Sequence, residues 1–211
     1  MKHKKLQSYI FAGGQNRRMQ GNHKAFLEFD GKKAIDILVY SLQDYGFDSI
    51  TIVTDKQSLF DGFQHGAVIE DSIPDKGPMG ALYTALTDTK TELILCLPCD
   101  MSFIDAELIE GITARAETEP ADCTVTVSSR GIEPLLAVYH TRLRQSIREA
   151  IESDRLSLTK FVQSAGSAYF DIRGSGIELH NINTPGDYMR AARSITAKNI
   201  LNKVCPNDGI D

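Results

Sequence analysis

Strand-like and helix-like segments alternate along most of this chain, and this order limits its fold more than any other feature of the sequence. Short apolar or β-branched runs predict strands, and apolar residues at helical spacing predict helices between them. The predicted strands cover residues 8–12, 49–54, 67–69, 93–97, 122–128, 135–139, 168–172 and 177–180; the predicted helices cover 33–45, 79–88, 105–117, 141–152 and 157–164, and a last helix opens at Thr184. This alternation predicts an α/β fold, with a mainly parallel sheet covered by helices on both faces.

The size and charge of the chain indicate how many domains it has and which binding partners it lacks. Its 211 residues, 42% of them hydrophobic, suit one domain, which we expect over residues 1–197 with a C-terminal tail over 198–211. A net charge of −5 provides no general attraction to nucleic acid or to anionic membranes. Apolar runs stay well short of the roughly 18 residues that a membrane span needs, and the stretch behind the basic N-terminus is too short for a signal peptide. We therefore expect a cytoplasmic protein that binds neither nucleic acid nor membranes.

The loop after the first predicted strand combines two glycines with a cluster of cations. Gly13 and Gly14 allow a sharp turn and expose backbone N–H groups. The cations that follow are Arg17, Arg18 and Lys24. A Gly-Gly turn alone is usually structural, but exposed N–H groups with fixed cations at the end of a first strand suit a polyphosphate. The spacing matches neither a P-loop nor a Rossmann fingerprint.

Two later strand ends also carry polar groups. Asp100 follows the wholly apolar run at 93–97, where open α/β sheets bind ligands. Alone it could be a turn or capping aspartate; beside the first loop it is a candidate Mg²⁺ ligand, because Mg²⁺ is held by one or two carboxylates and by substrate phosphates. Asp71 ends the third strand, and Gly77 and Pro78 open the next helix, whose N-terminus can meet an anion or the edge of a base.

The cysteines do not predict a metal or redox site. Cys96 and Cys99 form a C-x-x-C, but a second pair is missing and histidine is absent nearby in the sequence. Zinc needs more ligands than this, and a redox pair normally opens a helix. We expect structural thiols. The charged run from Arg142 to Arg155 is interpreted as a solvated helix face.

Two motifs carry a resemblance to a known family. Residues 12–24 resemble the A-G-G-x-S-x-R-M-G-x-D-K loop of nucleotidyltransferases, with Asn16, Gln20 and His23 as departures from it. Residues 181–187, Asn-Ile-Asn-Thr-Pro-Gly-Asp, resemble the N-x-N-T-P-x-D/E segment of the molybdenum cofactor guanylyltransferases, the MobA-like nucleotidyltransferases. The resemblance covers about residues 8–196.

The resemblance implies a fold and a reaction. The fold is the three-layer, Rossmann-like nucleotide-diphospho-sugar transferase fold, with a nucleotide-binding half at about 6–128 and an acceptor-binding half at about 129–197. The reaction is transfer of GMP from GTP to molybdenum-molybdopterin, which gives molybdopterin guanine dinucleotide and pyrophosphate. Mg²⁺ is the implied cofactor. The implied partners are GTP, the molybdopterin cofactor, proteins that deliver this cofactor and apo-molybdoenzymes that receive it.

The resemblance also implies roles for individual residues. The implied catalytic residues are Arg18, Lys24 and Asp100, with Asp100 as the metal ligand. The implied GTP-binding residues are Phe11, Ala12, Gly13, Gly14, Lys24, Thr54, Asp71, Gly77, Pro78 and Asp100. Thr54 stands near the place where the family usually has Asn, so it lacks the amide of that residue. Asn181 and Asn183 are the implied molybdopterin-binding residues; as alternate residues of an extended segment, their side chains point the same way.

Two alternatives remain open at this point. A cytidylyltransferase acting on molybdopterin, or on a sugar or alcohol phosphate, fits the first loop and Asp100 equally well. A protein that binds the cofactor or GTP without chemistry is the alternative from another class, and the departures at Gln20, His23 and Thr54 support it.

Overall fold

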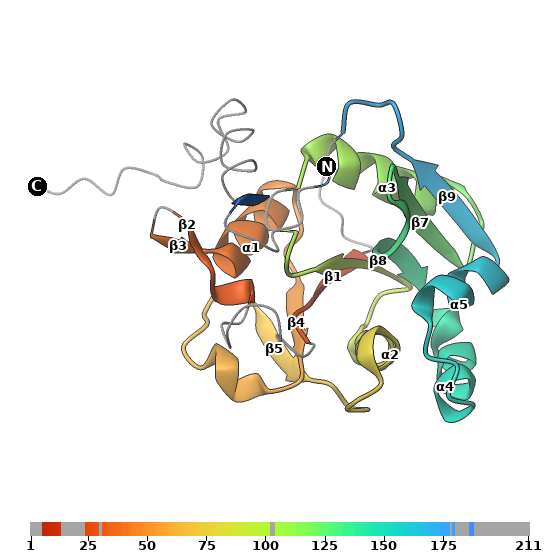
Figure 1. The fold of residues 1–211 in the computed structure, drawn as a ribbon, viewed down its shortest axis with the longest axis horizontal. Coiled ribbons are helices and arrows are strands. Elements are labelled where there is room, and N and C mark those ends of the chain that lie inside the picture. Colours follow the sequence, from red (N-terminus) through yellow and green to blue (C-terminus); the bar gives the residue numbers. More distant parts are fainter. Residues whose placement is uncertain are drawn as a thin grey trace, which may run out of the picture.

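The computed structural model describes residues 6–13, 24–29, 31–101, 104–177, 179 and 186–187. Its main sheet has the strand order β5-β4-β1-β6-β8-β7-β9 (Figure 1). The strands are β1 (Leu6–Phe11), β4 (Ile50–Thr54), β5 (Ala67–Glu70), β6 (Leu93–Pro98), β7 (Cys123–Ser128), β8 (Gly131–His140) and β9 (Ser167–Asp171). Within this sheet β8 runs antiparallel to both of its neighbours, and the other pairs are parallel. The predicted mainly parallel sheet is confirmed.

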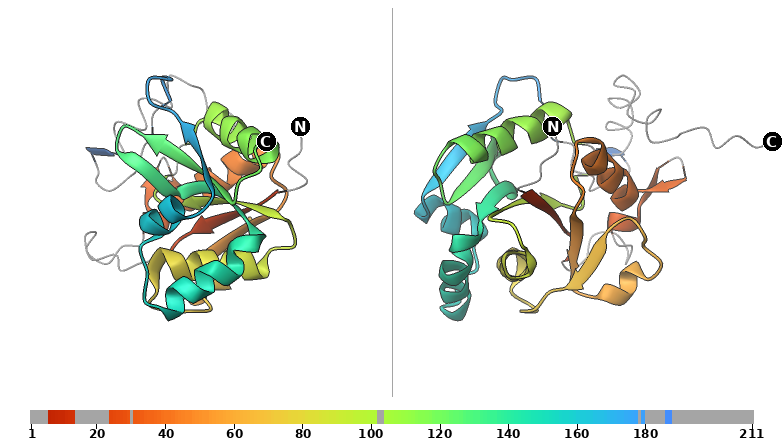
Figure 2. Two further views of the ribbon diagram at one scale, coloured as in Figure 1. Left: turned by 90° about the vertical axis from the view of Figure 1, so that its right-hand side faces the viewer. Right: turned by 180° about the vertical axis from the view of Figure 1, so that it is seen from behind.

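Helices cover both faces of the sheet, as predicted. One face carries α1 (Ala34–Asp44) and α3 (Ala106–Thr118); the other carries α2 (Gly77–Asp88), α4 (Arg144–Glu152) and α5 (Leu158–Ser164) (Figure 2). Successive strand residues point to opposite faces. Ile10 therefore packs with α1 and α3, while Tyr9 and Phe11 pack on the side of α2.

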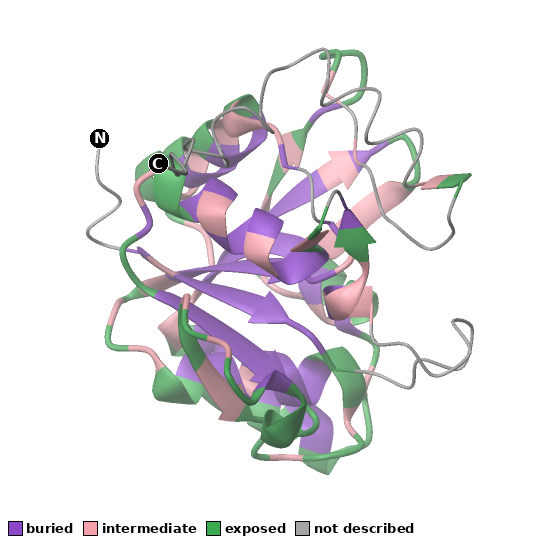
Figure 3. Cartoon of the chain, turned by 90° about the vertical axis from the view of Figure 1, so that its left-hand side faces the viewer, coloured by how far each residue is buried: buried purple, intermediate pink, exposed green. Residues whose placement is uncertain are grey.

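The central strands are apolar because both of their faces are covered. Residues 94–97 of β6 are all fully buried, and β4 is buried along its whole length. Figure 3 shows this buried sheet between helices whose outer surfaces are exposed. Each buried Leu or Ile side chain stabilises the fold by roughly 1.5–3 kcal/mol relative to an exposed one. The strand ends are thus held on a rigid, fully packed support.

The same alternation separates the two cysteines of the C-x-x-C. Cys96 belongs to the cluster packed under α2, α4 and α5, whereas Cys99 belongs to the cluster packed under α1 and α3. Both are free and buried, as is Cys123. Burial of these three thiols is what a structural role predicts. Cys205 lies outside the described residues.

Several elements differ from the sequence-based expectation. The predicted strand 135–139 is longer, since β8 begins at Gly131 after a tight hairpin turn from β7. The predicted helix 141–152 begins with the 3₁₀ turn η3 (Thr141–Leu143). Short elements that lacked a sequence signal are η1 (Lys24–Phe26), β2 (Glu28–Phe29), β3 (Lys32–Lys33) and η2 (Gln57–Phe60). They are two to four residues long, too short for any periodicity to show.

The predicted strand 177–180 is wrong at its described positions. Ile177 and Leu179 lie outside any strand, and each packs instead against the apolar cluster under α1 and α3. Their alternation imitates a strand because both side chains face this core. The last helix is described only at Gly186 and Asp187, which are helical; Thr184 lies outside the described residues.

The charged segment 142–155 behaves as predicted. Helix α4 buries Ile147, Ala150 and Ile151 and leaves its charged face in solvent. On that face Arg148 donates to Glu152 at 2.9 Å.

Candidate functional site

Four parallel strands, β5, β4, β1 and β6, end together at one edge of the sheet. The backbone ladder continues past their last residues: Ala12 N donates to Val53 O at 2.8 Å, and Cys99 N donates to Phe11 O at 3.1 Å. Asp71 N donates to Thr54 O at 2.9 Å in the same way on the outer side of β4. The loops after β1, β4, β5 and β6 are therefore fixed side by side, where open α/β sheets bind ligands.

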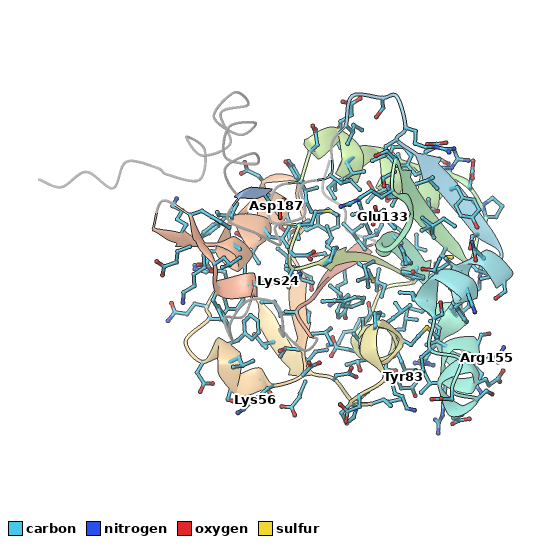
Figure 4. The ribbon with its side chains drawn as sticks, viewed as in Figure 1. Lys24, Lys56, Tyr83, Glu133, Arg155 and Asp187 are labelled. Carbon is cyan, nitrogen blue, oxygen red and sulfur yellow. The ribbon has the colours of Figure 1, made fainter. Side chains whose placement is uncertain are left out.

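The first and fourth of these loops are joined by an ion pair. Lys24 Nζ lies 3.0 Å from Asp100 Oδ2, although the two residues are 76 positions apart. Their side chains are 26% and 18% exposed, so the pair is partly desolvated but open to a ligand. Lys24 comes from η1, on the side of the molecule that carries α1 (Figure 4). Lys24 and Asp100, which the sequence analysis names as candidate site residues, thus lie together at the end of β6.

The thiol next to this pair stays neutral. Burial raises the pKa of Cys99 to about 12; the negative charge of Asp100 adds to this rise, and Lys24 opposes it. Without a bound metal, Cys99 is therefore protonated and a poor nucleophile at neutral pH.

The carboxylate of Asp55 lies against Gly13. A Cβ atom at this position would collide with Oδ1 of Asp55. Asp55 follows β4 directly and is exposed, whereas its neighbour Thr54 is buried and its hydroxyl accepts a hydrogen bond from Lys56 N at 3.4 Å. Of Thr54 and Asp55, it is Asp55 that borders the first loop. The sequence analysis did not name Asp55 as a site residue, although an acidic residue directly after a buried strand could have indicated it.

Asp71 is held against the start of α2. Its Oδ1 accepts hydrogen bonds from Ile73 N at 3.0 Å and from Thr84 Oγ1 at 2.9 Å. Burial raises the pKa of this carboxyl and nearby Asp55 adds to the rise, while the two hydrogen bonds lower it. Asp71 thus orders the loop that leads into α2, whatever else it binds.

Helix α2 begins beside this carboxylate. Gly77 has a φ of +57°, which favours glycine, and Pro78 occupies the first turn. A side-chain cap is missing at Lys76, the N-cap residue, whose ammonium instead pairs with Asp154 at 3.2 Å. The first N–H groups of α2 are therefore available to an anion or a polar base edge.

Several residues implied by the resemblance lie outside the described part of the chain. They are Gly14, Arg18, Asn181 and Asn183. Their assignments stay predictions. The structure brings together the described ones: Phe11, Ala12, Gly13, Lys24, Thr54, Asp71, Gly77, Pro78 and Asp100 all come from the four adjoining strand ends and their loops.

The oxygen donors at this edge fit a magnesium ion that is held mainly by the phosphates of a bound substrate. Asp100 offers a carboxylate, a hard oxygen donor. Within the described ranges, His, Cys, Asp and Glu do not gather in groups of three or more that could hold a metal alone. Mg²⁺ is commonly bound by one or two carboxylates, water and substrate phosphates, so this arrangement suits it. In the described ranges, the helices lack the length and apolar character that a membrane span requires.

Comparisons with known proteins agree with this arrangement. Residues 8–168 match the family described as the MobA-like NTP transferase domain. A "probable molybdenum cofactor guanylyltransferase" of Peptoclostridium acidaminophilum is 32% identical over 165 residues, 76% of this chain and 73% of the relative. Another of that name, from Flavobacterium johnsoniae, is 30% identical over 180 residues, 85% and 92% of the two chains.

A solved structure shares the fold. The crystal structure of "molybdopterin-guanine dinucleotide biosynthesis protein A" from Archaeoglobus fulgidus superposes with a TM-score of 0.75 at 21% identity, covering 90% of this chain and 99% of that one. This likeness confirms the three-layer nucleotidyltransferase architecture. The chain belongs to the MobA-like NTP transferase family, alongside the molybdenum cofactor guanylyltransferases.

Proposed function

We propose that the strand-end site transfers GMP from GTP to the phosphate of molybdenum-molybdopterin. The observation that carries this proposal is the Lys24–Asp100 pair, 3.0 Å apart beside the glycine loop at the ends of β1 and β6. A cation and a carboxylate side by side serve a metal-bound polyphosphate, which needs both a positive group and a metal ligand. The names of the relatives supply the choice of substrates.

The reaction needs positioning and charge neutralisation more than a protein nucleophile. An oxygen of the acceptor phosphate attacks the α-phosphorus of GTP, a new P–O bond forms, the bond from the α-phosphorus to the bridging oxygen breaks, and pyrophosphate leaves with that electron pair. The backbone at Ala12 and Gly13 holds the phosphates. Lys24 neutralises negative charge on the triphosphate, and we assign the same task to Arg18.

Asp100 is the residue that holds Mg²⁺ in this proposal. When bound, Mg²⁺ supplies charge neutralisation to the triphosphate. Asp100 would hold the ion, and the ammonium of Lys24 beside it would contact the phosphates. Other residues of the chain bind the two substrates. We assign Asp71 and the first turn of α2 to the base of GTP, and Asn181 and Asn183 to the pterin.

The decisive experiment measures pyrophosphate release with Mg²⁺, molybdenum-molybdopterin and one nucleotide at a time. We expect release with GTP and less than a tenth of it with CTP, ATP or UTP. Release with CTP instead would make the enzyme a cytidylyltransferase, and binding without release would make it a carrier.

Substitutions of Lys24 and Asp100 test whether the reaction takes place at this pair. Lys24→Ala and Asp100→Asn are each expected to lower kcat/KM by about 100-fold, as expected for a lost electrostatic contact in the transition state. Lys90→Ala is the matched control, because Lys90 is exposed and lies just before β6, at the opposite edge of the sheet. Near-normal turnover by Lys24→Ala would contradict the assignment.

A further inference from the structure

The short turn that carries Lys24 is joined to η2 by two aromatic rings. Phe26 is the last residue of this turn, η1, two positions after Lys24. Its ring packs against the ring of Phe60 in η2, with the ring centroids 4.9 Å apart and the ring planes tilted by 52°. Aromatic rings at this separation and tilt attract each other through their edges and faces. Phe26 therefore links the turn of Lys24 to a second element of the fold.

Phe60 is a fixed partner for this contact. It is buried, with 4% of its surface exposed, and belongs to the apolar cluster under α1 and α3. Element η2 begins three residues after β4 ends, and Gln57 Nε2 donates to Val68 O of β5 at 3.1 Å. Phe63 adds a further ring contact to Phe60, with centroids 6.2 Å apart. The ring that Phe26 meets is thus anchored on two of the strands whose ends form the candidate site.

A cation lies over the ring of Phe26 as well. Nζ of Lys33, in β3, is 5.5 Å from the centroid of this ring. An ammonium group over an aromatic face is attracted by the quadrupole of the ring. Lys33 directly precedes α1, and Ala34 N donates to Leu27 O at 2.8 Å. The segment that follows the turn of Lys24 is therefore fixed to the start of α1.

The backbone of η1 passes this fixed position on to Lys24. Leu27 N donates to Lys24 O at 3.3 Å, which closes the turn, and Ala25 is fully buried in the cluster under α1 and α3. The side chain of a lysine has a flexible four-carbon stem, so its ammonium reaches one place reliably only when its Cα is held. Here Lys24 Nζ lies 3.0 Å from Asp100 Oδ2. The position of the turn thus decides where this ammonium lies.

We propose that the Phe26–Phe60 ring contact positions Lys24 for catalysis, so that Phe26 is a positioning residue of the nucleotide site. This inference rests on the proposed function, in which Lys24 neutralises charge on the triphosphate. Such neutralisation depends steeply on the place of the cation, and a displacement of about 1 Å can lower a rate by a large factor. Loss of the ring contact shifts the turn and the ammonium with it, while the chemical groups of the site stay the same.

The kinetic test is a double-mutant cycle between Phe26→Leu and Lys24→Ala, with kcat/KM for GTP as the readout. We expect Phe26→Leu to lower kcat/KM about tenfold in the wild-type chain and less than twofold in the Lys24→Ala chain. A residue that acts through Lys24 has nothing to position once the ammonium is gone. Phe26→Tyr keeps the ring and should retain at least half of the wild-type value.

Phe161→Leu is the matched control. Phe161 is also a half-buried phenylalanine packed against an apolar cluster, but it lies in α5, on the other face of the sheet. This variant should melt at a lower temperature, as Phe26→Leu does, and keep kcat/KM within twofold of wild type. If Phe26→Leu causes the same loss with and without Lys24, or if Phe161→Leu loses as much activity, Phe26 only supports the fold and the proposal is overturned.

A second readout does not depend on turnover. Acetylation with acetic anhydride, followed by mass spectrometry, reports how accessible the ammonium of Lys24 is beside Asp100. We expect Phe26→Leu to raise the labelling rate of Lys24 at least threefold relative to exposed Lys90, and Phe26→Tyr to leave this ratio unchanged. If the wild-type chain releases no pyrophosphate with any nucleotide, the proposed function fails, and labelling alone then decides whether Phe26 positions Lys24. An unchanged ratio in Phe26→Leu overturns that claim.

Discussion

At the scale of single residues, Asp71 shows how a structural and a binding role can be separated. Its carboxylate already accepts hydrogen bonds from Ile73 N and Thr84 Oγ1, and an amide oxygen could accept both. Guanine, by contrast, presents two neighbouring N–H donors, for which an ionised carboxylate is the better partner. Replacement by asparagine therefore removes the charge and keeps the internal contacts.

The pH dependence of stability has a definite sign here. Burial raises the pKa of Asp71 above its ordinary value of 3.8, so the folded chain holds this proton more tightly than the unfolded chain. The resulting stability is present below pH 3.8 and is lost as the pH rises through the folded-state pKa. At pH 7 the ionised, half-buried carboxylate opposes folding.

We therefore predict that Asp71→Asn melts at or above the wild-type temperature at pH 7, and that this difference shrinks as the pH falls toward 4. If Asp71 receives the base, the same variant loses about 10- to 100-fold in GTP affinity, the range for a hydrogen bond to a charged group. Differential scanning calorimetry and nucleotide titration measure the two effects. A lower melting temperature with unchanged GTP affinity would show that the role of Asp71 is structural only.

At the scale of elements, helix α3 and strand β9 meet at a glycine. Gly111 lies in the middle of α3, where glycine weakens a helix by about 1 kcal/mol relative to alanine. A Cβ atom there would collide with the ring of Phe170 on β9. The glycine thus allows the helix to approach the sheet closely enough for the ring to pack.

Gly111→Ala is expected to lower the free energy of unfolding by about 1–3 kcal/mol, because overpacking outweighs the gain in helix propensity. Urea denaturation measures this change. Glu110→Ala, one position earlier on the exposed side of α3, is the control and should be near neutral. Combining Gly111→Ala with Phe170→Leu makes room for the new methyl group and should recover part of the loss. A stabilising effect of Gly111→Ala alone would contradict this account of the packing.

Elements were predictable wherever the hydrophobic pattern was long. The two faces of β1 and β6, and the buried stripes of α1 and α4, follow from spacing alone. Patterns of two to four residues carry too little information, which is why β2, β3 and the 3₁₀ turns were missed. Ile177 and Leu179 show the opposite error, since side chains anchored on a core can alternate without belonging to a sheet.

The site was predictable for a topological reason. Parallel strands bring their carboxyl ends to one edge, so Lys24 and Asp100 could be expected together despite the 76 residues between them. The contacts that depend on side-chain packing could not. The closeness of Asp55 to Gly13, and the hydrogen bonds that hold Asp71 on α2, involve neighbours that only the folded chain brings together.

At the scale of the whole molecule, the ends of one sheet assemble the candidate site. The loops after β1, β4, β5 and β6 form the candidate nucleotide site, and the segments after β7 and β9 line a separate cavity, with antiparallel β8 between β6 and β7. Neither place exists in an unfolded chain, because each is assembled from segments distant in sequence. Ligand binding must therefore stabilise the fold as a whole.

This linkage gives a prediction that does not depend on turnover. GTP with Mg²⁺ at 100 times its Kd should stabilise the wild-type chain by about 2.7 kcal/mol. For a chain of this size, that corresponds to a rise in melting temperature of about 5–10 °C. At the same GTP concentration Lys24→Ala should show less than half of the rise, while Lys90→Ala should match the wild type. A larger shift with CTP than with GTP would overturn the base assignment, and equal shifts for wild type and Lys24→Ala would remove Lys24 from the nucleotide site.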